Sequence, residues 1–189
     1  MILDEITRRR VEGILRKVNA WAPKMRKMSD EELQGQTAIL KDQLKHGKTV
    51  DDILPQAFAT IREADYRILG MFPYDVQVMG GIVLNWGYIA EMKTGEGKTL
   101  MATMPIYLNG LTGKGSMLVT PNDYLAERDE KQLAPVYQWL GLTVSLGFDK
   151  KVKRPKPPLK RSWYNSDIVY TTASTLAFDY LFNNLADSL

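Results

Sequence analysis

The chain has 189 residues, of which 25 are Lys or Arg, 22 are Asp or Glu, and 44% are hydrophobic. These values are typical of a globular protein and exclude disordered and collagen-like chains. Without cysteine and with one histidine, the sequence excludes disulfides, a thiolate metal site and a cysteine nucleophile. No apolar run approaches the roughly 18 residues that a membrane span requires, and the N-terminus lacks a signal-peptide stretch. We therefore expect a soluble, untargeted chain.

Positive charge is concentrated in two segments. Residues 1–28 hold eight Lys and Arg against three acids, net +5, and residues 149–161 hold seven against one, net +6. The rest of the chain carries a net charge of −8. This distribution favours contact with an anionic surface, either lipid or nucleic acid, although such runs are also typical of solvated helix faces and loops.

The first 70 residues are predicted to be helical. Residues 2–18 alternate apolar and basic side chains at helical spacing, which predicts a basic amphipathic helix that ends before Pro23. We expect its apolar side chains to enter an anionic lipid surface, with packing on the protein core as the alternative; they are Ile2, Ile6, Val11, Ile14 and Val18. Ser29, followed by three acids, predicts the cap of a second helix that runs to about Gly47. A third helix is expected over residues 51–69. We treat residues 1–70 as an N-terminal helical segment.

Residues 71–189 have an alternating pattern. Short apolar runs predict strands at residues 88–92, 116–120, 142–146 and 167–170. Helices are expected over residues 98–108, 123–140 and 174–185. Strands that alternate with helices predict an α/β fold with a parallel sheet. Residues 149–161 are too rich in proline for a helix and are expected to form an exposed loop.

A phosphate-binding loop is predicted between the first strand and its helix. Its residues are Thr94, Gly95, Glu96, Gly97, Lys98 and Thr99, preceded by Met92 where such loops commonly have glycine. The glycines let backbone N–H groups surround phosphates at the positive end of the helix dipole. Lys98 can reach the terminal phosphates and the Thr99 hydroxyl can ligate Mg²⁺. We predict ATP or ADP as the ligand of this loop, and Lys98 and Thr99 as catalytic residues.

Upstream of this loop, Gln77 is a candidate for recognising adenine. Its amide has a donor and an acceptor face, which suit the Hoogsteen edge and the exocyclic amine of the base. Met71 and Tyr74 could stack on the ring. An ordinary turn with packed side chains would give the same local pattern.

Three strings of this sequence resemble the first nucleotide-binding domain of the SecA family of preprotein translocation motors. They are DVQVMGGIVLNWGYIAEMKTGEGKTLMATMPIYLNGLTGKG, VTPNDYLAERD and FDYLFNNL, and the resemblance covers nearly the whole chain. It implies that residues 71–189 are the first part of a RecA-like P-loop domain of a superfamily 2 ATPase. It also implies that Gln77 reads adenine and that residues 120–129 form the next helicase-like motif.

Two departures from the general SecA pattern point to the accessory SecA 2 type of Gram-positive bacteria, which exports glycosylated surface adhesins. Before FDYL the chain reads Tyr170-Thr171-Thr172-Ala173 where the family commonly has Tyr-Gly-Thr-Asn, and the loop at 149–161 is unusually basic. By resemblance, the expected partners are a SecY-type translocon, a preprotein, accessory Sec proteins and anionic phospholipid. The expected location is cytoplasmic, peripheral on the inner face of the membrane.

The sequence lacks part of what ATP hydrolysis requires. A superfamily 2 ATPase needs an Asp-Glu pair after a later strand, to hold Mg²⁺ and to activate water. Asp129-Glu130 instead follows a helical, charged pattern. We therefore expect the chain to be part of a longer protein and to be inactive alone.

Two alternatives remain open. A nucleic-acid helicase domain would share the phosphate loop and the basic segments, but no aromatic residue is interleaved with the lysines of 149–161 to stack bases, so nucleic acid is the less favoured partner. The second alternative is a non-catalytic nucleotide-binding module that docks a partner through its N-terminal helices.

Overall fold

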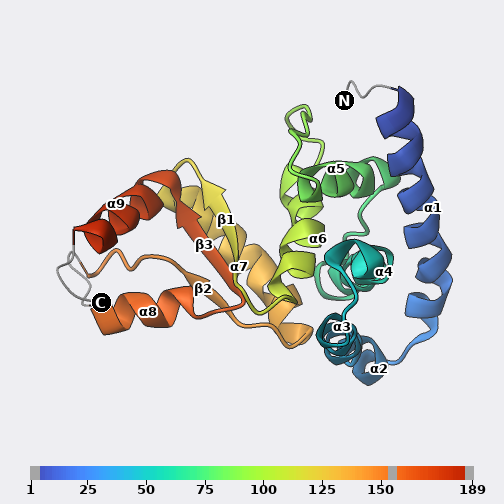
Figure 1. The fold of residues 1–189 in the computed structure, drawn as a ribbon, viewed down its shortest axis with the longest axis horizontal. Helices are drawn as coiled ribbons and strands as arrows, with labels where there is room; N and C mark the ends of the chain where they lie inside the picture. The colour runs from blue at the N-terminus through green and yellow to red at the C-terminus, as the bar shows by residue number, and fades with distance from the viewer. Residues whose placement is uncertain (1–4, 153–156, 186–189) are drawn as a thin grey trace.

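The computed structural model describes residues 5–152 and 157–185, which form a helical part and a part built on a sheet (Figure 1). The helical part consists of α1 (Glu5–Lys27), α2 (Asp30–Gln34), α3 (Gln36–Lys45), α4 (Val50–Leu69), α5 (Asp75–Asn85) and α6 (Lys98–Gly110). Helix α4 lies at the centre of this part and contacts α1, α3 and α6. It also contacts α7 (Asp123–Trp139), which belongs to the sheet part.

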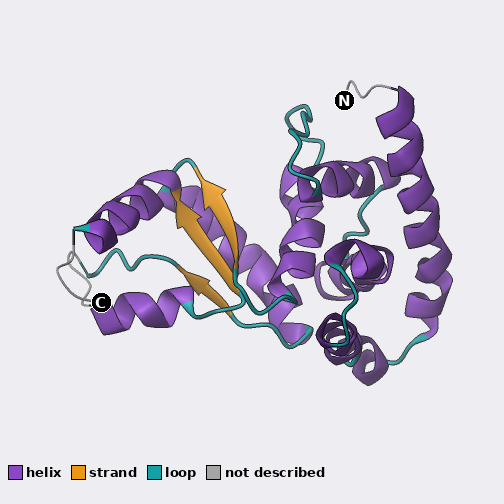
Figure 2. Cartoon of the chain, viewed as in Figure 1, coloured by secondary structure: helices purple, strands orange, loops and turns teal. Residues whose placement is uncertain are grey.

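The sheet has three parallel strands, seen side by side in Figure 2. The strands are β1 (Ser116–Thr120), β2 (Val144–Leu146) and β3 (Ile168–Thr172), in the order β1-β3-β2. Helices α7, α8 (Pro157–Tyr164) and α9 (Ala173–Asn184) flank it. Ile168 of β3 is in register with Ser116 on one side and with Val144 on the other. The predicted α/β class and three of the four predicted strands are confirmed; β1 has the predicted ends, and the ends of β2 and β3 are shifted.

One hydrophobic core runs through both parts. On α1, which contacts α4 and α5, three side chains seven residues apart are fully buried: Val11, Val18 and Met25. The same core continues through α6 and α7 to Tyr170 of β3. Because the helical part and the sheet share this core, the phosphate loop before α6 has a fixed position relative to the strands.

The predicted helix caps are confirmed. Ser29 accepts a hydrogen bond from the backbone N–H of Glu32, and the Glu32 carboxylate accepts one from the N–H of Ser29. Gly70 ends α4 in the left-handed conformation, with φ +68°. Both are local features, so the sequence pattern was sufficient to place them.

The largest correction concerns residues 88–92, which are not a strand. Tyr88 and Ile89 are 57% and 92% exposed, and the segment pairs with no strand of the described chain. A strand needs a neighbour to satisfy its N–H and C=O groups. The sequence has the apolar run of a strand, but no described strand pairs with it. The segment is therefore a loop.

Three further predictions also need correction, and one helix was missed. Helix α1 continues through Pro23 to Lys27. The helix predicted to run to Gly47 is two helices, α2 and α3, separated at Gly35. Helix α5 was not predicted. Residues 157–161, expected in a loop, belong to α8, because proline is tolerated in the first turn of a helix, where its missing N–H has no partner. Residues 153–156 of that expected loop lie outside the described residues.

Candidate nucleotide-binding site

Two glycines shape the phosphate loop. Gly95 and Gly97 have φ of +87° and +80°, a conformation that other residues adopt only with strain. Gly97 is the N-cap of α6, and no side chain in the described structure caps this end. The first N–H groups of a 13-residue helix are therefore left for a ligand. An open helix end preceded by glycines suits the phosphates of a nucleotide.

The loop is closed on itself in this structure. Lys98 donates from Nζ to the carbonyl oxygen of Lys93, at 2.8 Å. The backbone N–H of Lys93 donates in turn to Oε2 of Glu96, at 2.7 Å. Lys98 is exposed and Thr99 half-buried, at the first turn of α6. To hold a phosphate, Lys98 can donate one of its two remaining N–H groups, or exchange the Lys93 carbonyl for a phosphate oxygen, which is a stronger, charge-assisted partner.

Gln77 connects the turn before α5 to the phosphate loop. Its Oε1 accepts from the backbone N–H of Tyr74, at 2.7 Å, and its Nε2 donates to the carbonyl oxygens of Glu96 and Gly97, at 3.0 and 3.3 Å. Gln77 is only 4% exposed. The sequence did not indicate these contacts, because nearly twenty residues separate Gln77 from the loop.

These contacts limit how Gln77 could read adenine. Oε1 has a second lone pair, so it can accept from the exocyclic amine while it keeps the Tyr74 N–H. Nε2 lies within hydrogen-bond distance of two loop carbonyls, so a donation to the base competes with these contacts. Tyr74 is 74% exposed and Met71 is 37% exposed, which leaves both residues able to contact a base.

The other sequence motif lies at the end of β1. Thr120 donates from Oγ1 to the carbonyl oxygen of Asn122, and the Asn122 side chain caps α7 by accepting from Leu125 N–H, at 3.0 Å. The carboxyl ends of β1 and β3 and the phosphate loop lie on the same side of the molecule (Figure 2). Ligands of open α/β sheets bind at this side. Asp129-Glu130 lies within α7, as the sequence predicted.

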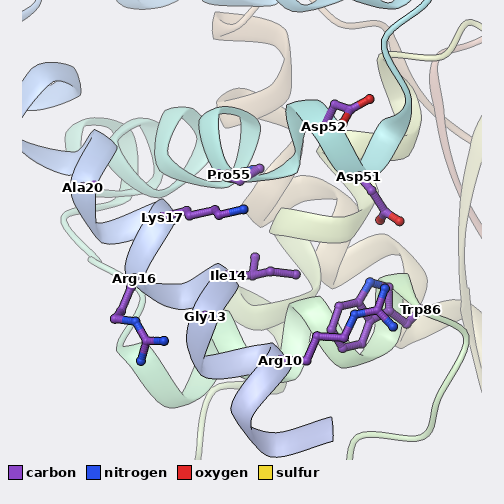
Figure 3. A pocket seen from close by; sticks show the side chains of 10 residues that line it. All are labelled: Arg10, Gly13, Ile14, Arg16, Lys17, Ala20, Asp51, Asp52, Pro55 and Trp86. Carbon is purple, nitrogen blue, oxygen red and sulfur yellow. The ribbon is translucent and has the colours of Figure 1, made fainter. Parts of the chain in front are cut away.

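A groove elsewhere is separate from this site. It has a volume of about 680 Å³ and lies between α1, the start of α4 and Trp86 (Figure 3). Arg10 of α1 stacks on Trp86, with its guanidinium carbon 4.6 Å from the ring centroid. The residues that line it include Lys17, Asp51 and Asp52, and none belongs to the predicted nucleotide site.

The structure corrects the expected membrane face of α1. Val11 and Val18, expected to enter a lipid surface, are fully buried in the protein core. Ile6 is 82% exposed, and Ile2 lies outside the described residues. Exposed arginines remain on the outer side of α1. In the part of the chain that the structure describes, no helix has both the length and the apolar character needed to cross a membrane.

Comparison with known proteins identifies relatives along the entire chain. The family model of the SecA DEAD-like domain matches residues 3–189. The chain is 68% identical, over all its residues, to the protein translocase subunit SecA 2 of Lactobacillus johnsonii. It is 54% identical over all its residues to that of Staphylococcus haemolyticus, and 54% identical over 95% of its residues to that of Streptococcus gordonii. It spans only about a quarter of these relatives, 24%, 24% and 23% of their lengths.

Proposed function

Because the chain belongs to the SecA family, as a SecA DEAD-like domain, we propose that it is the nucleotide-binding start of an ATP-driven motor that moves preproteins across the cytoplasmic membrane. The relatives named protein translocase subunit SecA 2 support the accessory form of this motor. Family membership also favours translocation over the nucleic-acid helicase alternative. Surface adhesins are the proposed substrates, and a SecY-type channel and accessory Sec proteins the proposed partners.

The observation that carries this proposal is the geometry of the phosphate loop. Two left-handed glycines lead into an open helix end, and Lys98 and Thr99 follow at once. Lys98 would hold the terminal phosphate oxygens of ATP, and Thr99 would hold Mg²⁺ through its hydroxyl. The bound Mg²⁺ would neutralise charge on the phosphates. The residues present fit both groups.

Hydrolysis needs residues beyond this chain. Asp129 and Glu130 are on α7, where Asp129 bonds to Arg128 and burial raises the pKa of Glu130. Neither follows a strand, as the acid pair of such an ATPase would. We therefore propose that the chain alone presents part of the nucleotide site without useful turnover. We also propose a domain division at residue 70, between an N-terminal helical segment and the first part of the nucleotide-binding domain.

The proposed location is the cytoplasmic face of the membrane, with peripheral attachment. Exposed arginines on α1 supply positive charge for anionic headgroups, and the buried valines of this helix anchor it to the core instead of to lipid. Attachment would therefore be electrostatic and reversible.

The decisive experiment is Lys98→Ala in the full natural protein. Losing one preorganised charge contact is expected to lower ATP turnover at least ~100-fold, and to weaken ADP and pyrophosphate alike. Lys114→Ala is the control, because Lys114 is an exposed lysine on the turn before β1. Turnover unchanged by Lys98→Ala would overturn the proposed site.

A further inference from the structure

Arg62 is a buried cation with an unusual set of partners. It lies on α4 and is 5% exposed. A buried guanidinium is costly unless its N–H groups are paired. Arg62 donates from Nε to the carbonyl oxygen of Pro73, at 2.6 Å, from Nη1 to Oδ1 of Asn19, at 2.6 Å, and from Nη2 to Oδ1 of Asp75, at 2.9 Å.

These partners come from three separate segments. Asn19 is on α1, Pro73 is in the connection from α4 to α5, and Asp75 is the first residue of α5. Asn19 also donates from Nδ2 to Oδ2 of Asp75, at 3.2 Å, so the three polar side chains form a closed set. The guanidinium carbon of Arg62 lies 4.3 Å from the centroid of the Phe72 ring. This cation–π contact fixes one more residue of the connection.

The fixed segment is the one that carries the candidate adenine contacts. Phe72, Pro73 and Asp75 surround Tyr74, whose backbone N–H donates to Gln77. Gln77 lies two residues after Asp75 and holds the Glu96 and Gly97 carbonyls of the phosphate loop. Arg62 therefore fixes where α5 begins, and through that start it fixes the backbone from which Gln77 reaches the loop.

We propose that Arg62, together with Asn19 and Asp75, is a positioning clamp that sets the affinity of the site for the adenine base without touching the nucleotide. This inference rests on the proposed function. The clamp acts more strongly on the base than on the phosphates, because its partners Pro73 and Asp75 lie beside the candidate base contacts, while it reaches the phosphate cradle, residues 95–99, only indirectly through Gln77.

Arg67 provides a matched control within the same helix. It is also a largely buried arginine of α4 with several partners. It donates to the carbonyl oxygens of Met25 and Met28 and pairs with Glu63 and Asp30. None of these residues belongs to the segment 71–77. Loss of either arginine should cost stability, but only loss of Arg62 should change base affinity.

The test is calorimetric binding of ADP and of pyrophosphate to the full natural protein, its Lys98→Ala variant, and the variants Arg62→Lys, Asn19→Ala and Arg67→Lys. Lysine keeps the positive charge of Arg62, but its ammonium group lacks the planar guanidinium geometry that donates to three partners in fixed directions. We expect Arg62→Lys to weaken ADP about tenfold, the scale of one lost charge-assisted hydrogen bond. Pyrophosphate should be weakened less than ADP, because the clamp reaches the phosphate loop only through Gln77. Arg67→Lys should leave the ratio of the two affinities unchanged.

The outcomes separate the two proposals. If the natural protein binds neither ligand, or if Lys98→Ala weakens neither, the proposed function fails and the clamp with it. If Lys98→Ala has its expected effect but Arg62→Lys weakens ADP and pyrophosphate equally, or neither, only the clamp is overturned. The clamp is also overturned if Arg67→Lys changes the ratio of ADP affinity to pyrophosphate affinity as much as Arg62→Lys does. Should Arg62→Lys not fold, Asn19→Ala decides, because it removes one partner of the guanidinium and keeps the charge; an unchanged ratio there overturns the clamp.

Discussion

Gln77 and Gly97 are in contact although twenty residues separate them, and the contact explains why residue 97 has no side chain. The amide Nε2 of Gln77 donates to the Gly97 carbonyl at 3.3 Å. A Cβ on residue 97 would lie 2.2 Å from that nitrogen. Glycine is thus required twice, for its positive φ and for the space that Gln77 occupies.

Gly97→Ala is expected to damage nucleotide binding beyond the cost of backbone strain. The strain itself is about 1–2 kcal/mol for a residue in the left-handed region. The new methyl group must also displace Gln77. Gly113→Ala is the control, because φ there is +71° and a Cβ meets no described atom within 4 Å. Both variants should lose stability in thermal unfolding, and only Gly97→Ala should weaken ADP and pyrophosphate. If Gly97→Ala and Gly113→Ala bound ADP and pyrophosphate equally well, the contact between Gln77 and Gly97 would have no role in nucleotide binding.

Gln77→Ala is expected to weaken ADP more than pyrophosphate. The base would lose its amide partner, whereas the cradle formed by residues 95–99 would remain. A smaller loss for pyrophosphate is also expected, because Gln77 holds the loop carbonyls in the structure. Titration of both ligands measures the difference. Equal losses would assign Gln77 only to holding the loop.

Asp65→Asn is expected to stabilise the protein at neutral pH. Asp65 is fully buried on α4, and its burial raises the carboxyl pKa well above the ordinary 3.8. The Thr103 Oγ1 has one hydrogen but lies 2.8 Å from Asp65 Oδ2 and 2.7 Å from the Leu100 carbonyl oxygen. A protonated Asp65 satisfies this arrangement by donating to Thr103, and the amide of asparagine can do the same.

The sign of the pH dependence follows from proton binding. Above pH 3.8 the unfolded chain releases the Asp65 proton, while the folded protein keeps it up to its raised pKa. The free energy of unfolding therefore falls as the pH rises through this interval. Asp65→Asn should remove that part of the slope in urea unfolding at pH 5 and pH 7, and exposed Asp51→Asn should not. A slope unchanged by Asp65→Asn would show that this carboxyl is not the titrating group.

A charge-reversal variant of α1 is expected to lose binding to anionic vesicles. Deleting this helix would remove Val11 and Val18 from the core, so the better variant changes only exposed side chains: Arg8→Glu, Arg9→Glu and Arg16→Glu. Each basic residue near such a surface contributes about 1 kcal/mol. The measurement is co-sedimentation with phosphatidylglycerol vesicles, compared with zwitterionic ones.

The control for this variant reverses three exposed lysines outside α1: Lys45→Glu, Lys48→Glu and Lys114→Glu. It should sediment like the natural protein. Binding of the natural protein should also be lost in ~0.5 M salt, where the Debye length is only a few ångströms. Retained binding by the α1 variant would transfer the membrane contact to residues 149–161.

The sequence alone determined the features that depend on neighbouring residues. The capping pair Ser29 and Glu32, the left-handed end of α4 at Gly70 and the glycines of the phosphate loop each follow from a short motif. The three paired strands were also predicted, because an apolar run between turn residues has few other solutions in an α/β chain. The family resemblance has the same origin, since it rests on the same motifs.

Tertiary structure decided which apolar runs pair and which side chains meet. Residues 88–92 have the sequence of a strand but pair with no strand among the described residues, so they remain a loop. The valines of α1 face the core instead of a membrane. The clamp around Arg62 joins residues as far apart as Asn19 and Asp75. Hydrogen bonds and burial between distant segments depend on how helices pack, and a local pattern contains no information about that packing.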